Sequence, residues 1–95
     1  MEIHDISRED ADLHLQDKED GSYFFRKSSR DPTGERCVVV LSFKYNEYTY
    51  HYLILNLNGC LQTLDSKECI SGFPFQLDDI KMHYPITNEL NPSTF

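Results

Sequence analysis

Residues 21–28, Gly-Ser-Tyr-Phe-Phe-Arg-Lys-Ser, limit the fold most strongly, because they end an aromatic strand with a fixed positive charge. Side chains alternate between the two faces of a β-strand, so Phe24 and Arg26 share one face while Tyr23 and Phe25 share the other. The guanidinium of Arg26 keeps its proton, and burying it without a partner is very costly. The strand end therefore needs a carboxylate of the fold, an external anion or solvent.

The residues after this strand favour a phosphate as the external anion. Ser28 and Ser29 add two hydroxyls, Arg30 adds a second guanidinium, and the turn 31–34, Asp-Pro-Thr-Gly, adds backbone N–H groups. Such donors around one bend suit a phosphate. On these residues alone, a solvated Arg26 at a strand end explains the pattern equally well.

The charge distribution limits the classes of partner. The net charge of −7 argues against nucleic acid and membrane as general partners, because both attract positively charged proteins. Residues 1–20 carry a net charge of −6, residues 21–54 carry +2, and residues 55–95 carry −3. Of these three parts, the one that is net positive also holds the possible phosphate site.

Length and cysteine content indicate one small cytoplasmic domain. A chain of 95 residues fits a single core, so we expect residues 1–95 to form one unit. Cys37, Cys60 and Cys69 leave one cysteine over from any pairing, which favours reduced, mostly buried thiols over a disulfide framework. The chain has no apolar run of about 18 residues and no signal peptide, which predicts a soluble protein.

Local patterns predict an α+β fold. Ser7 as N-cap, with Asp10 three residues later, predicts a helix that ends near residues 16–18. Apolar and aromatic runs between turn residues predict strands over 22–27, 36–45, 48–55 and 60–64. Pro74 can open a second helix, which Pro85 ends. The order predicts a central antiparallel β-sheet flanked by two α-helices.

Four sequence blocks resemble the Src homology 2 (SH2) domain. Residues 6–11, Ile-Ser-Arg-Glu-Asp-Ala, are similar to the Ile-Ser-Arg-Glu-Glu-Ala of the family's first helix. Residues 20–28 are similar to its Gly-Ser/Thr-Phe-Leu-Val-Arg-Glu-Ser strand, and Tyr-His-Tyr at 50–52 resembles its Lys-His-Tyr. Residues 77–84 match its Leu-x-x-Leu-Val-x-His-Tyr helix ending. The resemblance spans 6–84 and implies an intracellular module that binds phosphotyrosine peptides.

The resemblance also implies a role for each residue of a phosphotyrosine site. Arg26 would form a bidentate fork on two phosphate oxygens, and Arg8 would add a guanidinium beside the tyrosine ring. Ser28 and the Ser29–Arg30 loop would donate hydroxyl and N–H groups, while His51 would line the pocket and orient its neighbours. Phosphotyrosine has a long rigid ring that can reach an arginine deep in a sheet, whereas phosphoserine is too short.

Two departures from the family pattern affect the expected site. Met1 stands where the family has Trp, and Leu53 stands where many members carry a Lys that reaches toward the phosphotyrosine ring. The second change leaves Arg8 as the main cation beside the ring. We expect Tyr52 and Leu53 to form the surface that contacts the peptide residues after phosphotyrosine.

Two function classes remain open: a phosphotyrosine-binding module, and a degenerate domain of the same fold used for packing or for a phosphate-independent contact. An enzyme is not indicated, because the chain has neither Gly-x-Ser-x-Gly nor a cysteine followed by a phosphate-cradling loop closed by Arg. Cys60, Cys69 and His83 lack the spacing of zinc ligands, so we expect no metal and no cofactor. The expected partners of a monomeric domain are phosphotyrosine peptides or proteins, with no nucleic acid and no membrane.

Two further segments have simple interpretations. We expect the acidic run Glu9, Asp10 and Asp12 to be a solvated helix face, and the polar tail 88–95 to be partly loose.

Overall fold

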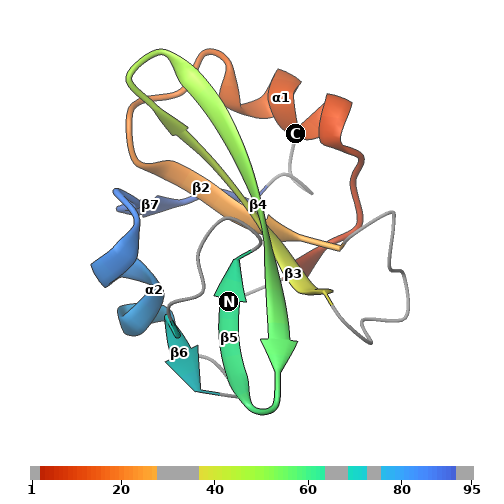
Figure 1. The fold of residues 1–95 in the computed structure, drawn as a ribbon. Helices are drawn as coiled ribbons and strands as arrows, with labels where there is room; N and C mark the ends of the chain where they lie inside the picture. Colours follow the sequence, from red (N-terminus) through yellow and green to blue (C-terminus); the bar gives the residue numbers. More distant parts are fainter. Residues whose placement is uncertain (1–2, 28–36, 64–68, 73–75, 92–95) are drawn as a thin grey trace.

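The computed structural model describes residues 3–27, 37–63, 69–72 and 76–91 and has an α+β fold, as predicted, with a mixed sheet and two helices (Figure 1). In chain order the elements are β1 (Ile3–His4), α1 (Arg8–Leu15), β2 (Ser22–Arg26), β3 (Cys37–Tyr45), β4 (Tyr48–Leu57), β5 (Cys60–Thr63), β6 (Ser71–Gly72), α2 (Leu77–His83) and β7 (Asn88–Glu89).

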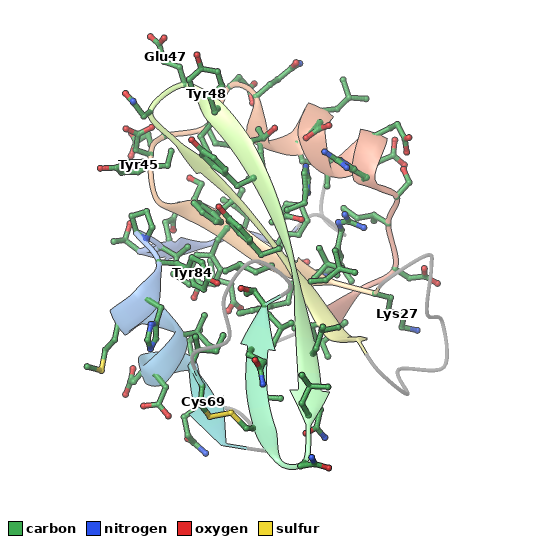
Figure 2. The ribbon with its side chains drawn as sticks, viewed as in Figure 1. Lys27, Tyr45, Glu47, Tyr48, Cys69 and Tyr84 are labelled. Carbon is green, nitrogen blue, oxygen red and sulfur yellow. A yellow bond between two sulfur atoms is a disulfide. The ribbon has the colours of Figure 1, made fainter. Side chains whose placement is uncertain are left out.

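The strands run β1-β2-β3-β4-β5-β6 across the sheet, and β7 also pairs with β2. The predicted antiparallel arrangement is confirmed from β2 to β6. The β3–β4 hairpin turns at Asn46 and Glu47, both in the left-handed region with φ of 50° and 72°, as the primed turns of tight hairpins require. Figure 2 shows Tyr45, Glu47 and Tyr48 at the tip of this hairpin.

Parallel pairing at the outer edge of β2 was not predicted. β1 pairs there with the second half of β2, and β7 with the first half. The prediction of a loose tail is wrong at β7, because the N–H of Leu90 also donates to the carbonyl of Tyr23 at 2.7 Å. Gly21, with φ of 91°, makes this junction possible, since a Cβ there would collide with the side chain of Thr87.

The two helices begin and end for different reasons. In α1, the hydroxyl of Ser7 accepts from the backbone N–H of Asp10 at 3.1 Å, which confirms the predicted N-cap. In α2, Gln76 makes no such side-chain bond, and the expected opening residue, Pro74, lies outside the described residues. Neither helix, nor any other in the described part of the chain, is long and apolar enough to cross a membrane.

Alternation along the strands gives the sheet two different faces, each covered by one helix (Figure 1). On the α2 face, Ile80 joins a large apolar core. Its buried members are Tyr23, Phe25, Val39, Leu41, Phe43, Ile54, Leu61, Ile70, Ile80 and Ile86. On the α1 face, Ala11 and Leu15 pack with Phe24 in a much smaller cluster, bordered by Ile6 and Leu90. The rest of the α1 face is available for polar side chains.

The prediction of reduced, mostly buried thiols is wrong for Cys60 and Cys69, which form a disulfide. Antiparallel pairing of β5 with β6 brings the Cα atoms of the two cysteines to 5.6 Å, within the range that a disulfide spans. Cys60 is half-buried and Cys69 is exposed. Figure 2 labels Cys69 and draws the disulfide in yellow. The pairing depends on a contact between strands that the spacing in the sequence does not reveal.

Candidate anion-binding site

Arg26 is buried at the end of β2, on the same face of the sheet as α1. Its side chain is 5% exposed although it carries a permanent charge. Arg26 pairs in register with Val40 of β3, and Val40 pairs with Leu53 of β4. These three side chains form one row across the α1 face, so the sheet itself fixes where the guanidinium lies.

The neighbouring row places two polar side chains beside Arg26. Phe24 pairs with Ser42, and Ser42 pairs with His51. The Nε of Arg26 donates to the hydroxyl of Ser42 at 3.1 Å, and this hydroxyl also lies 2.8 Å from Nδ1 of His51. The ring of His51 is only 4% exposed, so the contacts form in an environment largely shielded from water.

The row continues from the sheet to helix α1. Nε2 of His51 lies 2.6 Å from Oδ1 of Asp12, and the same oxygen accepts a hydrogen bond from the hydroxyl of Thr49 at 2.8 Å. A continuous chain of contacts thus runs from Asp12 through His51 and Ser42 to Arg26. We name these four residues the Asp12–Arg26 chain.

The ionisation of the Asp12–Arg26 chain follows from burial and from neighbouring charges. Partial burial by itself raises the pKa of Asp12, but hydrogen bonds from His51 and Thr49 and the charges of His51 and Arg8 outweigh it and lower the pKa. Burial lowers the pKa of His51, and Arg26 and Arg8 lower it further, against the opposing effect of Asp12. A neutral imidazole beside an ionised carboxylate is therefore favoured at neutral pH.

The structure brings together some of the residues expected in the site. Arg8, the first residue of α1, is exposed and lies four residues before Asp12, on the same face of the helix. Its charge lowers the pKa of both Asp12 and His51. Ser28, Ser29 and Arg30 lie outside the described residues. Among the described residues, no group of three or more His, Cys, Asp and Glu side chains could hold a metal ion.

Tyr52 and Leu53, which we expected on one surface, lie on opposite faces of β4. Leu53 lies in the row of Arg26 and Val40. Tyr52 points to the α2 face, where its ring is stacked 5.8 Å from Phe43 and lies 5.3 Å from Tyr84. Figure 2 shows Tyr84 between α2 and the sheet. The phosphate side and the aromatic side of the expected site are thus separated by the sheet.

Sequence reasoning missed Asp12 and Ser42. Asp12 was expected to be part of a solvated acidic face; its side chain is 46% exposed, but its carboxylate also contacts His51 and Thr49, which was not predicted. Its position four residues after Arg8 places both side chains on one helix face, which is a signal that could have been used. Ser42 stands out as a hydroxyl residue within the apolar run of β3.

Comparison with known proteins agrees with this architecture. The family model described as "SH2 domain" matches residues 3–84. A comparison with curated proteins found no match. The family match covers both helices and the strand that carries Arg26. SH2 domains are generally non-catalytic modules that bind phosphotyrosine peptides in signalling, and this chain belongs to that family.

Proposed function

We propose that this chain binds phosphotyrosine peptides by holding the phosphate on the guanidinium of Arg26. The observation that carries the proposal is a permanently charged side chain that is 5% exposed at a strand end and fixed there by a neutral hydroxyl. The guanidinium of Arg26 would form the fork on two phosphate oxygens. Arg8 would flank the phosphotyrosine ring from helix α1.

The remaining parts of the proposed site follow from their positions in the chain. Ser28, Ser29 and Arg30 follow β2 in the chain after Lys27 and would supply further donors to the phosphate. His51 would form the wall of the pocket. On the α2 face, Tyr52 would contact the peptide residues that follow phosphotyrosine. We further propose that the domain acts as a cytoplasmic monomer and as an adaptor.

The test is a titration of the chain with a phosphotyrosine peptide and with its unphosphorylated twin. Arg26→Ala should weaken phosphopeptide binding by about 30- to 1000-fold, because a desolvated contact between a guanidinium and a phosphate is worth about 2–4 kcal/mol. Arg26→Lys should restore little affinity, since an ammonium cannot form the planar fork. Lys27→Ala is the matched control, because Lys27 is the next cation in the chain and is exposed (Figure 2). It should change the affinity by less than about threefold.

Two outcomes would contradict the proposal. If Arg26→Ala binds as tightly as the wild type, the phosphate site lies elsewhere. If a phosphoserine peptide of the same sequence binds equally well, the site is shallow rather than deep.

A phosphate-independent contact is the second candidate function. It is favoured by one observation, the aliphatic side chain of Leu53 in the row of Arg26, where many family members carry a cation. This candidate requires equal affinity for the phosphorylated and unphosphorylated peptides. The same titration therefore separates the two functions.

A further inference from the structure

Asp12 places a negative charge beside a site proposed to bind a dianion. By charge alone this is unfavourable, because like charges repel at short range. The carboxylate nevertheless accepts two short hydrogen bonds, from Nε2 of His51 at 2.6 Å and from the hydroxyl of Thr49 at 2.8 Å. The structure therefore raises the question of what Asp12 contributes other than its charge.

The donors and acceptors of the Asp12–Arg26 chain can be satisfied in one consistent direction. An ionised carboxylate only accepts, so Asp12 calls for an N–H at Nε2 of His51. In a neutral ring Nδ1 is then an acceptor, and it takes the hydroxyl proton of Ser42. The oxygen of Ser42 keeps its lone pairs for the Nε–H of Arg26, which only donates.

We propose that Asp12 is a positioning residue of the phosphate site. It holds His51 in the Nε2–H tautomer, and through His51 and Ser42 it fixes the orientation of the Arg26 guanidinium before phosphate arrives. This inference rests on the proposed function, and it assigns to a residue of helix α1 a part in binding that needs no contact with the ligand.

Loss of the Asp12 carboxylate would change the hydrogen bonds of His51, Ser42 and Arg26 in turn. Without an acceptor at Nε2, the ring of His51 can move its proton to Nδ1, which would then donate toward Ser42. The hydroxyl of Ser42 would have to turn its proton elsewhere, and the Nε–H of Arg26 would face a less well-defined acceptor. Among the described residues, the charged groups that act on the ring are Asp12 and Arg8 from α1 and Arg26 from β2.

The experiment compares two substitutions that remove the same charge. Asp12→Ala removes the charge and the acceptor, and it should weaken phosphotyrosine-peptide binding by about three- to tenfold, the scale of one lost hydrogen bond. Asp12→Asn removes the charge but keeps an oxygen acceptor, and it should bind equally well or up to about threefold tighter, since one partly screened negative charge is gone. Removal of the negative charge alone should make both variants bind the phosphopeptide equally well or more tightly. Weaker binding by Asp12→Ala but not by Asp12→Asn would therefore be due to the lost acceptor.

Three further substitutions test whether the effect of Asp12→Ala comes from the positioning of His51. The alternatives are the loss of any helix charge or of any hydrogen bond to Asp12. Asp10→Asn removes an exposed charge of the same helix two residues before Asp12, and it should bind no more weakly than the wild type. Thr49→Val removes the other hydrogen bond to Asp12 and should change the affinity by less than about threefold. Ser42→Ala should make the effect of Asp12→Ala largely disappear, because both act on the same chain.

A spectroscopic measurement on the free domain tests the tautomer directly. In a long-range ¹H–¹⁵N spectrum, the His51 ring should carry its proton on Nε2 in the wild type and in Asp12→Asn, and should lose this preference in Asp12→Ala. Thermal unfolding verifies that each variant is folded.

The outcomes distinguish the positioning role of Asp12 from the proposed phosphotyrosine binding. If the wild type prefers the phosphorylated peptide but Asp12→Ala binds as tightly as Asp12→Asn with an unchanged tautomer, the positioning role is overturned and the proposed function stands. If the wild type binds both peptides equally, the proposed function is overturned, and this inference with it.

Discussion

The two faces of the sheet are built from the same strands but differ in what they bury. On the α2 face, Phe25 and its neighbours form a large aromatic and aliphatic core. On the α1 face, Phe24 packs in a small cluster with Ala11 and Leu15, and the Asp12–Arg26 chain lies beside it, with Asp12 on the helix and its other three residues on the strands. The comparison teaches that β2 serves both stability and the site, because its side chains alternate between the two faces.

The difference also shows how a small domain can bury polar groups. Among the described side chains, no buried nitrogen or oxygen lacks a hydrogen-bond partner. A guanidinium can thus sit in a sheet interior because the opposite face supplies the apolar area that stabilises the fold.

Phe25→Ala is the strongest test of the idea that the α2 face provides stability while the α1 face holds the site. Phe25 is fully buried in the α2-face core, so the substitution should lower the free energy of unfolding by about 3–5 kcal/mol. Chemical denaturation measures this loss, and phosphopeptide affinity per folded molecule should stay within about threefold of the wild type. Phe25→Leu is a milder variant with the same expected direction. A large loss of affinity without a loss of stability would show that the two faces are not separate.

Opening the Cys60–Cys69 disulfide tests the end of the sheet where β5 pairs with β6, at the border of the α2-face core. The bridge joins residues nine apart in the sequence, and closing a loop of this size stabilises a fold by about 2–3 kcal/mol. A reductant should therefore lower the midpoint of denaturation of the wild type. The double variant Cys60→Ser/Cys69→Ser should be less stable by the same amount and insensitive to reductant. An equal response of both proteins to reductant would contradict the role of this bridge.

Arg8 and Leu53 sharpen the description of the α1 face. Arg8→Ala should weaken phosphopeptide binding by about 1–2 kcal/mol, because a partly desolvated cation beside a ring and a phosphate is lost. Leu53→Lys places a cation in the row of Arg26 and should partly compensate for Arg8→Ala, while changing the wild type little. A double-mutant cycle on affinity measures the coupling. Strictly additive effects would show that the two positions do not share the ring.

Tyr23 gives the smallest expected effect and belongs to the α2 face. Burial, together with the charge and hydrogen bond of Glu89, raises the pKa of Tyr23 to about 12 from a usual value of 10. The raised pKa stabilises the fold fully below pH 10, and this contribution is lost as the pH rises toward 12. By pH 11 the loss should be about 1 kcal/mol, which urea titrations can measure. Tyr23→Phe should remove this part of the alkaline decline, and an identical decline in both proteins would refute the assignment.

Local sequence patterns predicted the parts of the fold that are determined locally. The N-cap at Ser7, the strand that ends at Arg26 and the turn at Asn46 and Glu47 each depend on residues close in the chain. The two-residue strands β1, β6 and β7 were missed, because two residues show no periodicity and form strands only through their partners.

The candidate site also combines features that depend on residues close in the chain with features that depend on distant partners. The burial of Arg26 follows from alternation in an aromatic strand, and its neighbours Ser42 and His51 follow only from the register of three strands. The contact between Asp12 and His51 joins positions 39 residues apart in the sequence and depends on how α1 packs on the sheet. Side-chain orientation also separates Tyr52 from Leu53, which adjacency in the sequence had grouped together.

The two short parallel strands beside β2 have a consequence for aggregation. A sheet edge presents unpaired N–H and C=O groups that can pair with another molecule. β1 and β7 cover one edge of β2 end to end, with Ile3 opposite Phe25 and Glu89 opposite Tyr23. The family match ends at residue 84, before β7 begins. A chain cut at that boundary would expose half of this edge on the strand that carries Arg26, and intermolecular strand pairing would then compete with folding.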